Sequence, residues 1–339
     1  MAKIVECVPN FSEGRNSATI KAIRDVISAV PGVKFISAEP DADYNRCVVT
    51  FIGEPSSVVE AAFAATRKAA ELIDMRQHSG GHPRLGATDV VPFVPVSGVT
   101  MEECVRLAHD YGKRVGEELG IPVYLYEEAA TRPERANLAT IRKGEYEGLP
   151  DRLKDPQWKP DYGPTEFNPK SGAIVTGARM FLIAYNVNLD TNDVKVAQEI
   201  AYRIRESGRV KKDNKGNPVL DEQGKKVNIR GTLKSVKAMG VLLEAHNIAQ
   251  VSMNLVNFHE TSPHIAFEEV RKQAETLGVK VSGSEIVGLT PKEALLVAGK
   301  HYRPQATEET ELLSVAVDKL GLSQLDQFDP TKKIIELQL

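Results

Sequence analysis

Residues 3–52 read KIVECVPNFSEGRNSATIKAIRDVISAVPGVKFISAEPDADYNRCVVTFI, and this stretch sets the order of the first elements. A short apolar run ends at Pro9, and Asn16 then caps a segment whose isoleucines and valines keep helical spacing. Two β-branched runs follow, at 33–37 and 47–52. The stretch therefore predicts a strand, a helix and two further strands.

The same order of elements recurs in the second half of the chain. The first half continues with a helix at 56–73, a loop at 76–92, a helix at 100–120 and a strand at 122–126. The second half predicts a strand at 180–187, a helix at 190–204, strands at 235–243 and 250–256, and a helix at 262–277. Each half fits the βαββαβ order of ferredoxin-like sheets. We therefore expect an α/β (α+β) fold of two ferredoxin-like subdomains, residues 1–178 and 179–339, with mixed sheets and helices on the outside.

Three segments fall outside this pattern. Prolines cluster with aromatic residues at 150–172, which predicts a rigid, irregular connector at the end of the first subdomain. The polar run at 208–231 predicts a surface excursion with a small hairpin and no catalytic role. The chain closes with an amphipathic helix at 308–320 and a tail at 332–339, which we expect to pack as a terminal strand.

Composition limits the possible partners and the compartment. The net charge of the 339 residues is −3, from 43 Lys and Arg against 46 Asp and Glu, which gives no global attraction to nucleic acid or to an anionic membrane. Cys7, Cys47 and Cys104 lack metal-type spacing and indicate reduced thiols. No apolar run approaches the ~18 residues that a membrane helix needs, and the N-terminus has no signal-peptide pattern. We expect a cytoplasmic protein that binds neither nucleic acid nor a membrane.

The densest group of chemically active residues is MRQHSGGHPRLGATDVVPFVP, residues 75–95. His78 and His82 have the spacing of a helical metal pair, but Gly80-Gly81 and Pro83 make a helix there improbable, so we expect no metal. A single histidine suits proton transfer near neutral pH. His82 is the better candidate, and we expect His78 to face solvent at the end of the preceding helix. The alternative is a flexible turn with solvated polar side chains.

Polar side chains at the ends of predicted strands indicate the walls of a pocket. Carboxamides and arginines in such places can bind carboxylates and amidines through directional hydrogen bonds. Turns that only cap the strands are the alternative interpretation. The candidate side chains are Asn10, Asn45, Arg46, Arg179 and Asn186.

Five blocks of sequence together resemble one known family. They are ECVPNFSEG at 6–14, HPR-x-GA-x-D-V at 82–90, GP-x-x-F-x-P-x-x-G at 163–172, GAR-x-FL-x-A at 177–184 and QVSMNL at 250–255. In this order they resemble the formiminotransferase domain of glutamate formiminotransferase, over nearly the whole chain. We expect the stand-alone form, without the cyclodeaminase part that is fused to it in animals.

The resemblance implies an activity and a set of site residues. The activity is transfer of the formimidoyl group of N-formimino-L-glutamate to N5 of tetrahydrofolate, in histidine degradation and one-carbon metabolism, by a homodimer. Tetrahydrofolate is then a co-substrate, and the histidine of HPR, His82, is the general acid. The implied folate contacts are Gly163, Pro164, Phe167, Pro169 and Gly172.

The chemistry of this transfer fits the residues present and leaves two alternatives open. Collapse of the tetrahedral adduct calls for one general acid and no covalent nucleophile. Glu39 and Asp41 can orient His82 or hold the amidinium, while Arg84, Arg46 and Arg179 can bind the carboxylates of the two substrates. One alternative is a glutamate formyltransferase that uses 5-formyltetrahydrofolate. The other is a non-catalytic folate- or amino-acid-binding module, which has no need of a titratable group at position 82.

Overall fold

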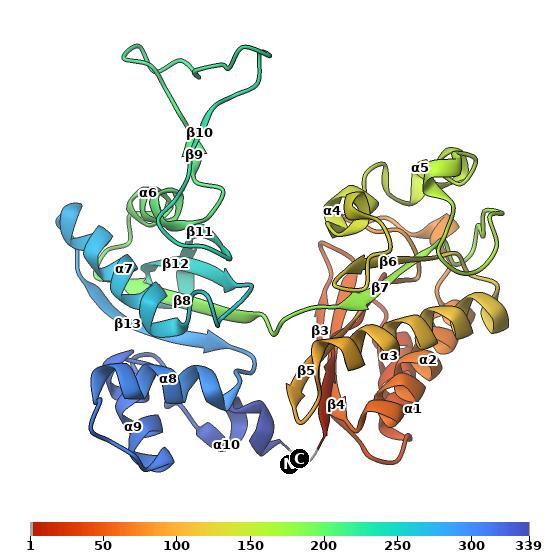
Figure 1. The fold of residues 1–339 in the computed structure, drawn as a ribbon, viewed down its shortest axis with the longest axis horizontal. Coiled ribbons are helices and arrows are strands. Elements are labelled where there is room, and N and C mark those ends of the chain that lie inside the picture. Colours follow the sequence, from red (N-terminus) through yellow and green to blue (C-terminus); the bar gives the residue numbers. More distant parts are fainter. Residues whose placement is uncertain (1–2, 339) are drawn as a thin grey trace. The chain divides into compact units, whose positions relative to one another are not determined.

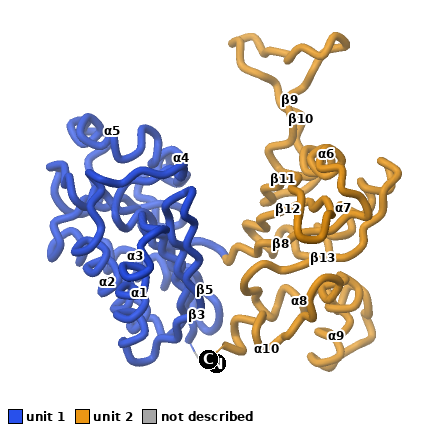
Figure 2. Tube along the Cα trace, turned by 180° about the vertical axis from the view of Figure 1, so that it is seen from behind, with its two compact units in different colours: residues 1–180, 339 blue, residues 181–338 orange. Residues whose placement is uncertain are grey.

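The computed structural model describes residues 3–338, and Figure 1 shows its ribbon. The chain divides into two compact units, which Figure 2 colours separately. Unit 1 extends to residue 180, and unit 2 comprises residues 181–338. Each unit has its own main sheet with helices packed on it.

The sheet of unit 1 is built around the predicted ferredoxin-like core. Its strands are β1 (Ile4–Cys7), β2 (Asn10–Phe11), β3 (Val33–Asp41), β4 (Arg46–Gly53), β5 (Thr88–Ser97), β6 (Val123–Glu127) and β7 (Ile174–Ala178). Strands β3, β4, β1 and β5 lie side by side in that order and pair antiparallel, which is the ferredoxin-like arrangement. The short β2 also pairs with β4 and β5, and β7 and β6 then extend the sheet in parallel with β5.

Three helices cover one face of this sheet: α1 (Ser17–Ser28), α2 (Pro55–Leu72) and α3 (Met101–Arg114). The Asn16 carboxamide accepts two backbone N–H bonds at the start of α1, and Thr100 and Glu103 form a capping box at the start of α3. Alternate strand residues, Val5 and Cys7 among them, are buried in the core beneath these helices.

The opposite face of the unit 1 sheet carries two short helices, α4 (Leu138–Ile141) and α5 (Glu145–Arg152). Ile141 and Leu149 of these helices form a second small core with Val90, Tyr124 and Tyr126 of the sheet. We call this side of the sheet the α4/α5 face. The remaining turns of unit 1 are 3₁₀-helices at Met75–Gln77, Pro133–Arg135 and Pro156–Trp158 and a π-turn at Val115–Leu119.

Unit 2 repeats the same strand order. Its strands are β8 (Ile183–Leu189), β9 (Arg209–Val210), β10 (Asn228–Ile229), β11 (Val236–Leu243), β12 (Ile248–Leu255) and β13 (Val281–Val287). Its helices are α6 (Val194–Ile204), α7 (Pro263–Thr276), α8 (Lys292–Tyr302), α9 (Glu309–Lys319) and α10 (Pro330–Lys333), with 3₁₀ turns at Glu244–His246 and Ile335–Leu337. Strands β11, β12, β8 and β13 form an antiparallel sheet in that order. Strands β9 and β10 form the predicted hairpin, which projects from unit 2 (Figure 1).

The predicted α+β class is confirmed, and a ferredoxin-like strand order is present in each unit. The loop predicted at 76–92 is shorter, because β5 begins at the polar residues Thr88 and Asp89. The Pro-rich segment 150–172 belongs to unit 1 and is followed there by β7, so it does not link the units.

The predicted terminal strand at 332–339 is wrong for its described residues, which form short helical turns; Leu339 lies outside them. Ile334 makes only an isolated bridge to Thr290, so no ladder continues from it. Within residues 3–338 no helix has the length and apolar character needed to cross a bilayer.

Candidate active site

The loop between α2 and β5 packs against the turn between β3 and β4. The Gly81 N–H donates to the Asp43 carbonyl at 3.3 Å, and the rings of Tyr44 and His82 lie 5.9 Å apart. A Cβ on Gly80 would lie 2.2 Å from the Tyr44 carbonyl oxygen, so the contact between the two segments requires glycine there. Gly80 therefore allows the loop between α2 and β5, which we call the histidine loop because it carries His78 and His82, to pack against the end of the sheet.

Asn45 ties three segments together. Its backbone has the left-handed φ of 48°, which asparagine tolerates better than most residues. Its side-chain oxygen accepts from the Gly14 N–H at 3.0 Å, and its side-chain nitrogen donates to the Ser79 carbonyl at 3.0 Å. Both ends of the predicted ligand carboxamide therefore already have protein partners.

His78 is held as a neutral imidazole with a defined tautomer. Arg84 Nε donates to His78 Nδ1 at 3.2 Å, and His78 Nε2 donates to the Asn45 carbonyl at 2.9 Å. Burial, followed by the charge of Arg84, lowers its pKa, while the bond to Asn45 opposes the shift. His78 does lie at a helix end, because it follows the 3₁₀-helix Met75–Gln77, but the expectation that it faces solvent is wrong, because its ring is half-buried.

His82 is half-buried in a cationic environment. Burial lowers its pKa to about 4, and the positive charges of Arg46 and Arg142 act in the same direction. The backbone of Pro83 and the carboxylate of Asp41 act weakly in the opposite direction. The imidazole is therefore uncharged at neutral pH, with Asp41 as the carboxylate that favours its protonation.

Arg142 and Asp89 complete this environment. Asp89 is the extra residue of a β-bulge, because Asn10 pairs with Val90 while Phe11 pairs with Thr88. Its carboxylate accepts from the Leu85 N–H at 2.8 Å and from the Arg142 guanidinium. Burial raises the pKa of Asp89, and the charges of Arg142 and Arg46 oppose that shift.

Several polar atoms of this region are buried without a partner. They are Nε of Arg46, Nε of Arg142 and the Thr88 hydroxyl, for which no hydrogen bond is found within residues 3–338. Buried donors without acceptors are uncommon in folded proteins. Arg46 and Arg142, whose charges act on His82, thus each keep a buried N–H that no group in the described residues accepts.

Two of the arginines predicted to bind substrate carboxylates, Arg84 and Arg179, have hydrogen-bond partners within unit 1. The Arg84 guanidinium donates to Glu147 at 2.6 and 2.8 Å and to Glu145 at 3.0 Å, so its carboxylate-binding capacity is already used within unit 1. Arg179 donates to the Met180 carbonyl at 3.0 Å. Its positive charge opposes the effect of burial, which raises the pKa of Tyr126 to about 12.

The predicted folate segment 163–172 is divided between two places in unit 1. A Cβ on Gly163, the neighbour of Pro164, would lie 2.4 Å from the Ile121 carbonyl, next to the end of α3. The other end reaches the histidine loop, where Gly172 forms a bridge with Gly86. There Tyr146 packs on Phe167 with ring centroids 5.4 Å apart and donates its hydroxyl to the Pro169 carbonyl.

The remaining predicted residues lie on the sheets. Asn10 is in β2 and half-buried, and Glu39 is exposed in β3. Asn186 belongs to unit 2, where its side chain donates to Glu285 at 3.0 Å.

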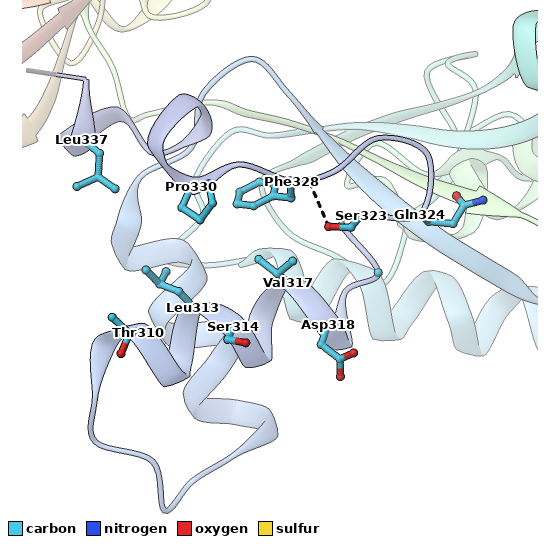
Figure 3. A pocket seen from close by; sticks show the side chains of 11 residues that line it. Thr310, Leu313, Ser314, Val317, Asp318, Ser323, Gln324, Phe328, Pro330 and Leu337 are labelled. Carbon is cyan, nitrogen blue, oxygen red and sulfur yellow. Dashed lines mark hydrogen bonds between the residues drawn. The ribbon is translucent and has the colours of Figure 1, made fainter.

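A cavity in unit 2 has a different character. Its volume is about 810 Å³, and Figure 3 shows its lining from α9 and the segment that follows, including Leu313, Val317, Phe328 and Leu337. Asp318 is the titratable side chain in this lining, and no histidine is present. The concentration of catalytic side chains therefore favours the His82 region. No group of three or more His, Cys, Asp or Glu within residues 3–338 is placed to hold a metal ion.

Known families match both units. A family model described as the formiminotransferase domain, N-terminal subdomain, matches residues 4–179, and one described as the formiminotransferase domain matches residues 184–339. The chain belongs to the formiminotransferase domain family. The resemblance found from the five sequence blocks is therefore confirmed.

Relatives of this formiminotransferase-domain protein fall into two lengths. The formimidoyltransferase-cyclodeaminase of Dictyostelium discoideum is 48% identical over 340 residues, which cover 99% of this chain and 60% of the relative. Glutamate formimidoyltransferases of Streptococcus pyogenes serotype M1 and Thermoplasma acidophilum are 46% and 48% identical, over 94% and 92% of their lengths and 89% and 88% of this chain. The chain thus spans about 60% of the length of the cyclodeaminase-containing relatives that it matches.

Sequence reasoning missed several residues that lie next to the loop containing His82 or contact it, such as Asp89, which accepts from the Leu85 N–H, and Tyr146, whose N–H donates to the Arg84 carbonyl. Asp89 is a fixed position of the HPR-x-GA-x-D-V block, so the resemblance contained a signal for it, whereas Thr88 occupies a variable position of that block. Arg142 and Tyr146 come from the segment around α4 and α5, where the sequence shows a polar stretch without a motif. Only the packing of α4 and α5 on the sheet of this formiminotransferase-domain protein reveals them.

Proposed function

We propose that the chain is a glutamate formimidoyltransferase, which moves the formimidoyl group of N-formimino-L-glutamate to N5 of tetrahydrofolate. The observation that carries the proposal is the match to two relatives of that name, at 46–48% identity over 88–89% of this chain. His82, in the HPR block of the resemblance, supplies the titratable group that the transfer needs.

The proposed reaction needs one proton carrier. The N5 lone pair of tetrahydrofolate attacks the amidine carbon, and a tetrahedral adduct forms. The bond between that carbon and the glutamate nitrogen then breaks. The proton that N5 loses ends on the amino group of the glutamate product, so atoms and charge balance without a further reactant.

An uncharged His82 fits the first half of this sequence. With its pKa lowered to about 4, the imidazole is free to accept the N5 proton at neutral pH and then donates that proton to the leaving nitrogen. The general-acid role thus belongs to the second step. Carboxylates of bound substrate offset the charges of Arg46 and Arg142, which raises the pKa of His82 within the complex.

The unpartnered donors beside His82 support binding of the amino-acid substrate. Nε of Arg46, Nε of Arg142 and the Thr88 hydroxyl can donate to the carboxylates of N-formimino-L-glutamate. The Phe167 and Tyr146 rings offer apolar surface to the flat rings of the folate.

The wider role follows from the same assignment. We propose a cytoplasmic enzyme of histidine degradation and one-carbon metabolism, with tetrahydrofolate as co-substrate and a homodimer as the working form. The described cysteines are free and buried, which is in keeping with a reducing compartment. The homodimer is proposed from the family resemblance.

A direct assay tests the proposed function. The purified chain is incubated with N-formimino-L-glutamate and tetrahydrofolate, and the folate product is followed by absorbance. A parallel reaction supplies 5-formyltetrahydrofolate and glutamate. We expect turnover of the formimino pair at a much higher kcat/KM than the formyl pair. Absence of turnover, or preference for the formyl pair, would contradict the proposal.

A further inference from the structure

Glu6 is a buried carboxyl for which the proposed reaction has no task. It lies in β1, within the block ECVPNFSEG, and is 5% exposed. Its neighbours Val5 and Cys7 are buried in the core beneath α1, α2 and α3. Because side chains alternate along a strand, Glu6 points to the α4/α5 face.

The Glu6 carboxyl has no hydrogen-bond donor in the part of the chain that the structure describes. Nor is an ion pair to it found there; Arg179 acts on it as a counter-charge at longer range. Burial raises the pKa of Glu6 to about 7, which the charge of Arg179 only partly offsets. The Glu6 oxygens are not among the fully buried atoms without a partner, so the carboxyl of this largely buried residue keeps a small exposed area through which a donor from outside can reach it.

The neighbourhood of Glu6 is fixed in place. Glu6 lies opposite Ile52 of β4 and Val94 of β5 in the ladder. The Arg179 N–H donates to the carbonyl of Phe93, next to Val94, and its guanidinium is held by the Met180 carbonyl. The Arg179 segment therefore runs beside Glu6 without pairing with it.

Two arginines connect Glu6 and His82 electrostatically through Tyr126. Arg179 acts electrostatically on both Glu6 and Tyr126. Arg142 acts on both Tyr126 and His82. Tyr126 lies on the α4/α5 face, to which Glu6 also points.

We propose that the Glu6 carboxylate binds the edge of the tetrahydrofolate pterin ring that carries the 2-amino group and N3–H. This inference rests on the proposed function. The edge presents two coplanar N–H donors at the spacing of a guanidinium, which matches the two oxygens of a carboxylate.

The other co-substrate fits Glu6 less well. The amidine of N-formimino-L-glutamate also offers N–H donors, but its carbon reacts and must lie at His82. The charges that act most strongly on His82 are those of Arg46, Arg142 and Asp41. The carboxylates of either substrate would be repelled by Glu6. The pterin edge is the partner that remains.

Changing Glu6 in the protein and the 2-amino group in the ligand, separately and together, tests this assignment. Wild type and Glu6→Gln are titrated with 5-formyltetrahydrofolate and with its analogue in which a methyl group replaces the 2-amino group. The control variant is Glu54→Gln, an exposed carboxyl that starts α2 without a capping bond. Glutamine keeps the shape but places an N–H against the donor edge of the ring.

We expect Glu6→Gln to weaken binding of 5-formyltetrahydrofolate by about 10- to 100-fold, the range for a lost charge-assisted hydrogen bond. Wild type should lose a similar factor with the analogue. The variant should lose little more with the analogue than with the parent ligand, because both changes remove the same contact. The KM for N-formimino-L-glutamate should change less than 3-fold, and Glu54→Gln should match wild type.

Several results would overturn the assignment. They are unchanged folate affinity in Glu6→Gln, equal affinity of wild type for the two folates, or a rise confined to the KM of N-formimino-L-glutamate. The comparison of the two folates on wild type stays decisive even if Glu6→Gln does not fold. If wild type turns over both substrates and one of these results appears, only the role of Glu6 fails. If wild type neither binds folate nor turns over, the proposed function fails as well.

Discussion

The two units share one strand order but differ in whether the polar side chains of their sheets are fully hydrogen-bonded. In unit 2 the polar side chains satisfy one another. Gln250 donates to Asn188 at 2.7 Å and to Glu285 at 2.8 Å, and Asn188 donates to Gln324 at 2.6 Å. These residues lie on the face opposite α6, because Gly240, whose neighbour across the ladder is Val251, packs on α6.

In unit 1 the polar groups are left incomplete. Within residues 3–338, every buried side-chain nitrogen or oxygen found without a partner belongs to unit 1: Nε of Arg46, Arg135 and Arg142 and the Thr88 hydroxyl. The Glu6 oxygens are not in this set and so keep some contact with solvent, but the described residues give that carboxyl no hydrogen-bond donor. The same strand order thus carries a closed hydrogen-bond network in unit 2 and buried donors without acceptors in unit 1.

Two histidines provide the strongest test of this contrast. Each unit holds one histidine with a pKa of about 4, and burial is the main cause of the low value in both. His264 of unit 2 is bonded to Ser262 at 2.9 Å and stacked on His301 at 4.4 Å, whereas His82 is bonded to the backbone of Pro83 and its ring lies 5.9 Å from that of Tyr44, without stacking on it. We expect His82→Ala to lower kcat by about 10²- to 10⁴-fold with little change in folate affinity. His264→Ala should keep kcat within a few-fold of wild type. Steady-state kinetics and a folate titration of both variants measure this, and a reversed order would break the comparison.

We expect the next largest effect from substitution of a carboxyl residue, measured as a change in stability. Glu6 has no donor in the described chain, whereas Glu285 accepts from Asn186 and Gln250. A pKa raised from 4.5 to about 7 means that folding disfavours the charged form, so wild type loses stability as pH rises from about 4.5 through 7. Glu6→Gln should therefore be more stable than wild type by about 3 kcal/mol at pH 8, and no different below pH 4.

Glu285→Gln should give no such gain, because its carboxylate is already bonded. Denaturant midpoints of the three proteins at pH 4 and pH 8 check this without any ligand. Equal midpoints of wild type and Glu6→Gln at pH 8 would show that Glu6 is satisfied in solution.

Arginine gives the smallest of these effects. Arg46 has an unpartnered Nε beside His82, whereas Arg203 of unit 2 is bonded to Glu199 at 2.8 Å. We expect Arg46→Gln to raise the KM for N-formimino-L-glutamate by about 10-fold, since a charge-assisted bond to a carboxylate is lost. Arg203→Gln should leave that KM unchanged. Equal effects of the two substitutions would remove Arg46 from the binding site.

Much of the fold was predictable because it rests on local signals. Asn16, Thr100 and Glu103 cap helices as their sequence positions suggest, and alternating apolar residues such as Val5 and Cys7 lie in the core. The start of β5 was missed, because Thr88 and Asp89 are polar and interrupt the apolar pattern of a buried strand. Asp89 is bonded to Arg142 instead of continuing that pattern.

The site was predictable only in part, because burial and pairing are long-range properties. His82 could be chosen from its glycine-rich loop, but the sequence could not show that Arg84 is neutralised by Glu145 and Glu147 or that Arg142 comes to Asp89. Nor could it show that His78 is tied down by Asn45 and Arg84. These contacts join residues that are distant in the sequence, and no periodic pattern of residue types predicts them.

The central claim is that His82 works as an uncharged imidazole set among cations whose charge the substrate offsets. An NMR titration of the His82 ring, first in the free protein and then with saturating glutamate, measures this directly. The account predicts a pKa near 4 in the free protein, in line with its burial beside Arg46 and Arg142, and a clear rise with glutamate bound. A pKa at or above the ordinary 6.5 in the free protein, or one that glutamate leaves unchanged, would contradict it.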